Sequence, residues 1–160
     1  MAQACLAQEL GLDPDPGFLR ERRFYLALLA APCALLLLDR LLPGWRAERP
    51  PAVGIAMTLV LWSPLLEELL FRGVIQGQLA RHARLRLSFA GVSLANLAAS
   101  LLFALAHLFH HPVSWALAVI LPSLVFGHFR DRHGLYPALL LHAAYNGCYA
   151  WLGSAPGMPS

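Results

Sequence analysis

Five apolar segments alternate with short polar ones along the chain, over residues 24–42, 52–80, 87–109, 113–129 and 135–152. Each is close to the roughly 20 residues that an α-helix needs to span a bilayer. None alternates between apolar and polar positions as membrane-spanning strands do. The pattern therefore predicts an all-α fold, a polytopic membrane helical bundle with about five transmembrane helices.

The polar segments divide the chain into three predicted parts. Residues 1–23 form a polar N-terminal leader, residues 24–152 a single intramembrane domain, and residues 153–160 a short tail. A stretch rich in Pro, Gly and Arg over residues 43–51 predicts a loop between the first two helices. No soluble domain is expected.

Composition strengthens the membrane interpretation. Of 160 residues, 58% are hydrophobic and only 13% are charged, and the mean hydropathy is +0.57. A soluble domain has about a quarter charged residues, so this chain has too little polar surface to cover a water-soluble globule. The net charge of +3 comes with 12 basic residues, all arginine. They lie in short groups between apolar segments, which favours a role in membrane topology over nucleic-acid binding.

The arginines also predict an orientation. With the N-terminus inside, eight arginines fall in inside segments and three in outside segments, which favours a cytoplasmic N-terminus. The inside set is Arg20, Arg22, Arg23, Arg81, Arg84, Arg86, Arg130 and Arg132, and the outside set is Arg40, Arg46 and Arg49. An all-arginine basic set with many Ala, Leu, Gly and Pro residues indicates a GC-rich bacterial source. We therefore expect the bacterial inner (cytoplasmic) membrane.

Charged residues within the second apolar segment are the first sign of function. Glu67, Glu68 and Arg72 lie there, although a charge at the bilayer centre costs at least about 2.5–3.5 kcal/mol. Glu68 and Arg72 are four residues apart, so they are expected to pair on one helix face. Glu67 lies about 100° around the helix from Glu68, and it therefore needs another partner or a wet cavity.

Two further apolar segments carry polar side chains that must avoid lipid. His107 lies late in the third segment, and His142 and Asn146 lie four residues apart on one side of the fifth. One shared interior site is the simplest arrangement for all three segments. A carboxylate, two imidazoles and a carboxamide around one cavity would supply a base, a proton shuttle and oxyanion donors.

The predicted depths of the two histidines differ by about 10 Å at 1.5 Å per helical residue. His107 falls toward the outer end of its segment and His142 in the inner half of its own. Two explanations stay open. Either the third helix begins later, with residues 85–95 at the membrane interface, or the helices are strongly tilted.

The ordered motifs Glu67-Glu68-x-x-x-Arg72, Phe103-x-x-x-His107 and His142-x-x-x-Asn146 resemble the CPBP family, the CAAX prenyl protease and bacteriocin-processing (Abi) proteins. The chain is identified as a small member. The resemblance implies a glutamic-type intramembrane endopeptidase without a cofactor, in which Glu67 activates water and His107 shares that water. It also implies that His142 and Asn146 donate to the oxyanion, and that Glu68 and Arg72 support the site.

The substrate implied by the resemblance is a membrane-anchored protein or peptide: a prenylated tail, a bacteriocin leader or a hydrophobic C-terminal sorting anchor. Two alternatives concern the same residues. Glu67, His107 and His142 are also a donor set that zinc accepts, and a non-catalytic immunity or peptide-binding protein could use the same cavity. A proton- or metal-coupled transporter is a further alternative, but the sequence shows no internal repeat.

Overall fold

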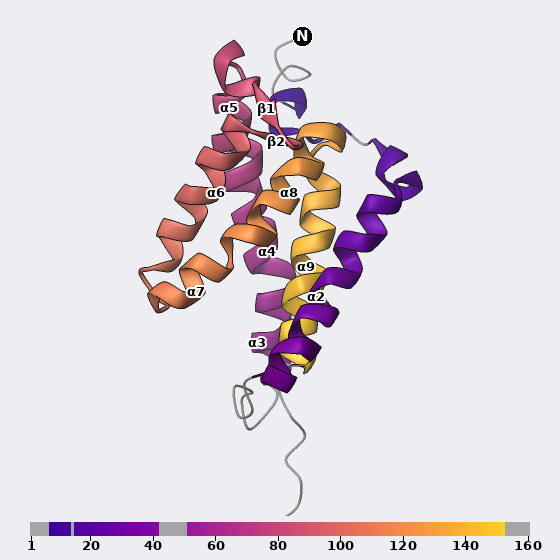
Figure 1. Cartoon of the computed structure of the whole chain (residues 1–160), viewed down its shortest axis with the longest axis vertical. Coiled ribbons are helices and arrows are strands. Elements are labelled where there is room, and N and C mark those ends of the chain that lie inside the picture. Colours follow the sequence, from indigo (N-terminus) through magenta and orange to yellow (C-terminus); the bar gives the residue numbers. More distant parts are fainter. Residues whose placement is uncertain (1–6, 14, 42–50, 153–160) are drawn as a thin grey trace, which may run out of the picture.

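The computed structural model describes residues 7–13, 15–41 and 51–152, and these form a bundle of helices with one very short β-hairpin (Figure 1). The predicted tail and most of the predicted loop over 43–51 lie outside the described residues. The α-helices are α2 (Arg22–Leu41), α3 (Val53–Met57), α4 (Ser63–Glu68), α5 (Gly77–Leu79), α6 (Leu94–His107), α7 (Val113–Ala118), α8 (Ile120–His133) and α9 (Leu135–Leu152). The remaining elements are the 3₁₀ helices η1 (Pro16–Arg20) and η4 (Ala83–Arg86), the π-helices η2 (Thr58–Trp62) and η3 (Leu69–Gln76), and the strands β1 (Ser88–Phe89) and β2 (Val92–Ser93).

The second predicted segment forms one unbroken helix, Val53–Leu79, in which α3, η2, α4, η3 and α5 follow one another. The residues at the junctions, Thr58, Ser63, Leu69 and Gly77, all keep right-handed helical backbone angles. The two π-helical stretches lie immediately before and after α4, which carries Glu67 and Glu68. Such wide turns are uncommon and are frequent at functional sites.

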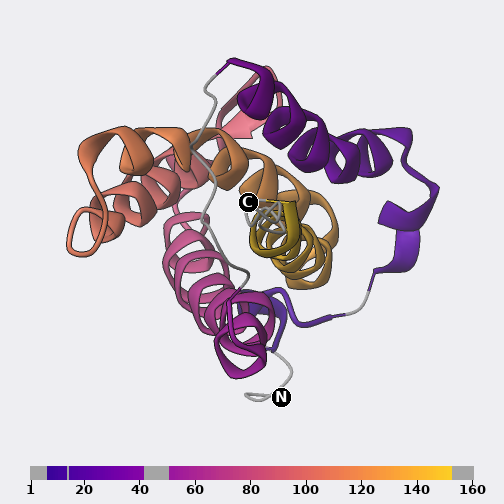
Figure 2. The ribbon, with the colours of Figure 1, turned by 90° about the horizontal axis from the view of Figure 1, so that it is seen from below.

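Helix α9 lies in the middle of the bundle. Seen from below, α2 and the Val53–Leu79 helix lie on opposite sides of it (Figure 2). α9 also packs along α8, and α6 packs on α8 and η3. A cluster of buried side chains from α2, α8, α9 and the N-terminal segment fills the space between these helices, with Phe24, Phe126, Phe129 and Leu141 among its members.

The third predicted segment, residues 87–109, is not one helix. It begins with the β1–β2 hairpin, in which Ser88 pairs with Ser93 and Phe89 with Val92. Ala90 and Gly91 form the two-residue turn with positive φ angles of 51° and 84°, as tight hairpins require. The Ser93 hydroxyl then accepts a hydrogen bond from the Asn96 amide at 3.0 Å and caps α6. The third helix therefore starts late, which is the first of the two explanations for the depths of His107 and His142.

Two helical stretches of the described residues combine the length and the apolar composition needed to cross a membrane. Val53–Leu79 and Val113–His133 are long and apolar enough to cross a bilayer, and Leu94–His107 is apolar but shorter. Large apolar side chains such as Trp62, Leu66 and Leu121 are exposed on the outside of the bundle, where lipid would cover them. The number of spanning helices, about five from the sequence, stays a prediction.

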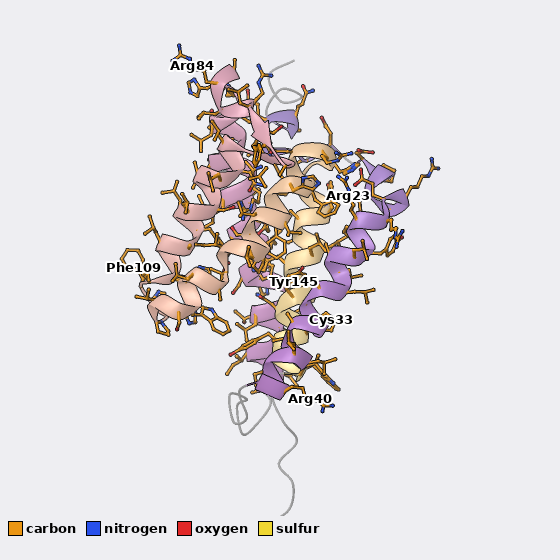
Figure 3. All side chains as sticks on the ribbon, in the orientation of Figure 1. Arg23, Cys33, Arg40, Arg84, Phe109 and Tyr145 are labelled. Atoms are coloured by element: carbon orange, nitrogen blue, oxygen red, sulfur yellow. The ribbon has the colours of Figure 1, made fainter. Side chains whose placement is uncertain are left out.

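Arginine-rich segments gather at one end of the bundle, as the labels of Arg23 and Arg84 illustrate, while Arg40 lies at the opposite end (Figure 3). The N-terminal segment packs across this arginine-rich end. The amide of Leu135 donates to the Gly11 carbonyl at 2.7 Å, and the ring of Phe18 packs edge-on to Phe24 at 4.8 Å. The predicted inside set is thus separated in space from Arg40, whereas Arg46 and Arg49 lie outside the described residues. The side of the membrane that each end faces stays a prediction.

Candidate active site

The centre of the candidate site is a buried ion pair on the Val53–Leu79 helix. Glu68 and Arg72 are both fully buried, and the Arg72 Nε atom lies 3.4 Å from Glu68 Oε2. This is the pair that the four-residue spacing predicts. Both partners are inaccessible to water, so each depends on the other for its charge to be tolerated.

Three neutral polar side chains complete the surroundings of the Arg72 guanidinium. Nη1 donates to the Ser100 hydroxyl on α6 at 3.3 Å and to Gln76 Oε1 at 3.5 Å, and Nη2 donates to the Ser123 hydroxyl on α8. All three acceptors are fully buried. Arg72 thereby joins three helices at the level of the site, and its orientation toward Glu68 is fixed from several directions.

A polar chain continues from Arg72 toward the arginine-rich end. The Gln76 amide donates to Asp131 Oδ1 at 2.7 Å and to the Gly127 carbonyl at 2.9 Å. The Ser93 hydroxyl donates to Asp131 Oδ2 at 2.6 Å. The interior charges are therefore held in a hydrogen-bonded network that reaches the hairpin and the last turns of α8.

His142 on α9 lies between the two glutamates. Its Nδ1 atom is 2.8 Å from Glu68 Oε1, and its Nε2 atom is 3.7 Å from Glu67 Oε2. The ring is buried and stacks on Phe126 with centroids 5.1 Å apart. A donor hydrogen bond from Nδ1 to a buried carboxylate fixes the orientation of the ring, so Nε2 is directed at Glu67.

Glu67 is the less restrained of the two carboxylates. Its side chain is 33% exposed, and its contact with His142 is longer than a hydrogen bond. The groups that act on it electrostatically are His142, His107 and Glu68. Glu67 thus combines partial access with two neighbouring imidazoles, which is the environment a general base needs.

His107 lies beside this cluster without a direct hydrogen bond to it. Its Nδ1 atom is 2.9 Å from the Phe103 carbonyl, which accepts the proton of that nitrogen and leaves Nε2 free of this contact. The Phe103 ring contacts both histidines, with centroid distances of 4.5 Å to His107 and 5.9 Å to His142. His107 and His142 therefore both pack against the same aromatic side chain.

Asn146 lies one helical turn beyond His142 on α9. Its Nδ2 atom donates to the Leu59 carbonyl in η2 at 2.9 Å. An amide nitrogen carries two hydrogens, so one donor is not used by this bond. Asn146 is thereby tied to the π-helical stretch that precedes the two glutamates.

A cavity of about 540 Å³ adjoins these residues. His107, His142 and Asn146 line it together with apolar and aromatic side chains of α2, α7, α8 and α9. Glu67 is not among the lining residues, but it lies 3.7 Å from Nε2 of His142, which is one of them. The space is mostly apolar with a few polar groups on one wall, as is typical of ligand pockets.

The structure thus places Glu67, Glu68, Arg72 and His142 together, with His107 and Asn146 on the adjoining cavity. Sequence reasoning missed Gln76, Ser123 and Asp131 as partners of this site. Gln76 continues the four-residue spacing of Glu68 and Arg72, and that signal was available. Ser123 is a lone hydroxyl in an apolar segment and gives no such signal.

The described residues contain no group of three or more His, Cys, Asp or Glu side chains arranged to hold a metal ion. His142 uses Nδ1 for Glu68, and His107 uses Nδ1 for the Phe103 carbonyl. Each histidine would therefore present Nε2 to any ligand in the site.

Comparison with known proteins gives one match. A family model described as type II CAAX prenyl endopeptidase, Rce1-like, matches residues 49–148. The matched range contains all six residues of the predicted site, Glu67, Glu68, Arg72, His107, His142 and Asn146. No curated protein and no solved structure matches the chain.

Proposed function

We propose, on the premise that the chain belongs to the Rce1-like family of type II CAAX prenyl endopeptidases, that it cleaves its substrate with water activated by Glu67. Members of that family are peptide-bond hydrolases, and the chain is an integral membrane protein whose substrate is a membrane-associated peptide. The observation that carries the proposal is the placement of His142 between a buried, ion-paired Glu68 and a partly open Glu67.

The proposed reaction begins at Glu67. Its carboxylate takes a proton from water, and the resulting hydroxide attacks the carbonyl carbon of the scissile bond. The carbonyl oxygen becomes an oxyanion, and the proton held by Glu67 passes to the leaving nitrogen as the C–N bond breaks. A carboxylate near imidazoles in a water-poor site is suited to carry one proton through both steps.

His142 and Asn146 are proposed to stabilise the oxyanion. His142 is oriented by the 2.8 Å contact with Glu68, so in the imidazolium form, with Nδ1–H donating to Glu68, the Nε2 proton would point into the space beside Glu67. Asn146 retains one amide hydrogen after its bond to Leu59. Donors fixed before the reaction in a low-dielectric site lower the barrier more than mobile donors in water. His107 is proposed to share the attacking water with Glu67.

The cavity supports a substrate with an apolar chain next to the scissile bond. Its walls are contributed mainly by apolar and aromatic residues of α2, α7, α8 and α9. A prenylated tail, a hydrophobic sorting anchor or a leader segment would all satisfy this requirement, and the metal-free glutamate mechanism serves each of them.

The test is cleavage of a panel of these membrane-anchored substrates by the full chain in proteoliposomes. We expect Glu67→Gln to lower the cleavage rate by about 10²–10⁴-fold, while Glu21→Gln, the same change outside the site, stays within about twofold of wild type. A chelator should have no effect.

Other outcomes separate the alternatives. Activity that is lost on chelation and restored by zinc would make Glu67, His107 and His142 metal ligands. Unchanged cleavage by Glu67→Gln would show that Glu67 is not the general base. Binding of the same peptides by wild type and Glu67→Gln, without cleavage by either, would favour a non-catalytic peptide-binding protein.

A further inference from the structure

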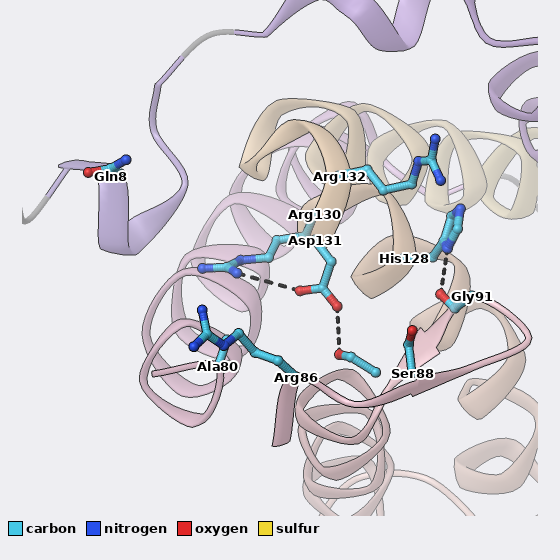
Figure 4. A pocket seen from close by; sticks show the side chains of 10 residues that line it. Gln8, Ala80, Arg86, Ser88, Gly91, His128, Arg130, Asp131 and Arg132 are labelled. Carbon is cyan, nitrogen blue, oxygen red and sulfur yellow. Dashed lines mark hydrogen bonds and ion pairs between the residues drawn. The ribbon is translucent and has the colours of Figure 1, made fainter. Parts of the chain in front are cut away.

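A second cavity lies at the arginine-rich end, away from the candidate active site. It has a volume of about 660 Å³ and lies between η4, the β1–β2 hairpin and the last turns of α8 (Figure 4). Its polar lining includes Arg86, Ser88, His128, Arg130, Asp131 and Arg132. No residue of the proposed catalytic machinery lines it.

The charges of this cavity are unbalanced. Three guanidinium groups face one carboxylate, that of Asp131. Asp131 accepts hydrogen bonds from Gln76 and Ser93, and it is also paired with Arg130 at 3.6 Å. Arg132 pairs with Glu21 outside the cavity at 3.0 Å. The cavity therefore keeps a net positive charge, and no carboxylate among the described residues pairs with Arg86.

Arg130 carries a donor that nothing satisfies. Its side chain is only 10% exposed, and the Nε–H group is buried with no hydrogen-bond partner among the described residues. Its other contacts are a donor bond from Nη2 to the Glu9 carbonyl at 2.8 Å and an ion pair from Nη1 to Asp131 at 3.6 Å. A buried donor without a partner is costly, and a ligand that accepts from it would remove that cost.

Arg86 and Arg130 direct their guanidinium groups to the same side of the cavity (Figure 4). Two like charges so placed repel each other unless an anion lies between them. His128 is held across the cavity by a 2.6 Å contact between its Nδ1 atom and the Gly91 carbonyl. The Ser88 hydroxyl lies on the hairpin wall. Two guanidinium groups on one side of a cavity match the tetrahedral, multiply accepting phosphate group.

We propose that this cavity binds a phosphate group, held by Arg86 and Arg130. Two sources share that chemistry, the headgroup of an anionic phospholipid and free phosphate. The cavity lies where the apolar Val113–His133 helix ends, which is the depth of lipid headgroups, and basic pockets between helices at this depth bind anionic lipids.

The experiment uses the full chain in detergent and measures binding of phosphatidylglycerol, phosphatidylcholine and inorganic phosphate by native mass spectrometry and thermal shift. We expect phosphatidylglycerol to bind more tightly than phosphatidylcholine. Arg86→Gln should weaken phosphatidylglycerol binding ~10-fold or more, because hydrogen bonds to a charged group contribute about 1.5–3 kcal/mol. Arg84→Gln is the matched control, since Arg84 lies on the same 3₁₀ helix but does not line the cavity. It should leave binding unchanged.

Arg130→Gln is a second variant with the same expected loss. Because Arg130 also holds the N-terminal segment through Glu9, Arg86→Gln decides the matter if the Arg130 variant does not fold. Tight binding of inorganic phosphate but not of phosphatidylglycerol would support the phosphate site and assign it to the free anion.

Three outcomes would overturn the proposal. One is equal loss of phosphatidylglycerol binding in Arg86→Gln and Arg84→Gln, which would indicate general charge attraction. Another is equal, Arg86-dependent binding of a carboxylate lipid such as oleate, because the site would then not select phosphate. The third is the absence of any phosphate or phosphatidylglycerol binding by wild type.

Discussion

The interior site and the arginine-rich end each contain a histidine placed between two carboxylates, one of which is also paired with an arginine. In the interior, His142 contacts Glu68 at 2.8 Å and Glu67 at 3.7 Å, and Arg72 pairs with Glu68. Glu68 and Arg72 are completely buried. Glu68, paired with Arg72, fixes the histidine, and the second carboxylate, that of Glu67, keeps a looser contact.

At the arginine-rich end, His133 contacts Asp15 at 2.7 Å and Glu21 at 3.0 Å, and Arg132 lies 3.0 Å from the same Glu21 oxygen. Here Asp15 is 52% exposed and Arg132 is 49% exposed. Both carboxylates are within hydrogen-bond distance of the imidazole, so neither keeps the looser contact that Glu67 has in the interior. This cluster ties the N-terminal segment to the end of α8.

The comparison shows how depth and distance give similar residues different tasks. Around His133, water screens the charges and both carboxylates are engaged, so the cluster can only hold two segments together. Around His142, water is largely excluded and one carboxylate remains free to take a proton. The looser 3.7 Å contact is therefore the feature that makes the interior cluster a candidate for chemistry.

Replacing the two histidines should separate these tasks most clearly. His142→Gln keeps a polar side chain near Glu68 but cannot carry a positive charge or pass a proton. We expect kcat for peptide cleavage to fall by about 10²–10⁴-fold, with KM little changed because the apolar cavity walls remain. Initial-rate kinetics in proteoliposomes measure both constants.

His133→Gln is the matched control for that prediction. It should leave kcat within about twofold of wild type, because the contacts of His133 are with the N-terminal segment and not with the candidate site. Equal losses of kcat in the two variants would mean that His142 acts through stability alone. Retention of a folded, monodisperse His142→Gln protein excludes that explanation.

Replacing the arginine of each cluster should also have clearly different effects, here on the free energy of unfolding. Arg72→Gln leaves Glu68 as a buried charge without its ion-pair partner, and such a change costs about 3–5 kcal/mol. Arg132→Gln removes a half-exposed pair, which is worth about 0–1 kcal/mol. Reversible denaturation in mixed micelles gives both free energies of unfolding, and similar values for the two variants would contradict the burial of Arg72.

A hydroxyl partner of Arg72 should have a smaller effect. Ser123→Ala takes away the acceptor of one guanidinium donor in a fully buried place, so we expect a loss of about 1–3 kcal/mol. Ser114→Ala makes the same change on the exposed face of α7 and should stay within about 0.5 kcal/mol of wild type. The same denaturation assay compares them, and an unaffected Ser123→Ala protein would show that Arg72 does not need this bond.

The interior cluster was more open to prediction from the sequence than the exposed one. Charges within an apolar segment stand out, so Glu67, Glu68 and Arg72 could be found by their cost in lipid. Helical spacing then predicted the pair between Glu68 and Arg72. The contacts of His142 with both glutamates join residues more than 70 positions apart, and spacing on one helix carries no information about them.

The arginine-rich end could be predicted only in outline. Counting arginines separated the two ends of the bundle, but Asp15 and Glu21 gave no sign that they meet His133 across more than 100 residues. The late start of α6 was one of two explanations that the sequence left open, because residues 87–93 are mostly apolar and small and continue the apolar segment. The turn at Ala90 and Gly91 that redirects the chain is a local backbone feature that hydropathy does not detect.

The smallest expected effect concerns pH at the arginine-rich end. The Gly17 amide and His133 hold the pKa of Asp15 below its ordinary value of 3.8, and hydrogen bonds from His133 and Arg132 hold the pKa of Glu21 below 4.5. A carboxyl whose pKa is lower in the folded state stabilises that state above its ordinary pKa, and the contribution is lost as the pH falls through the folded value. The attachment of the N-terminal segment should therefore be constant from neutral pH down to about pH 5 and weaken below about pH 4.

Amide hydrogen exchange of residues 16–24, corrected for intrinsic rates, measures this attachment. In the double variant Asp15→Asn, Glu21→Gln the acid-induced change should vanish, and a profile identical to wild type would show that these carboxylates do not hold the segment.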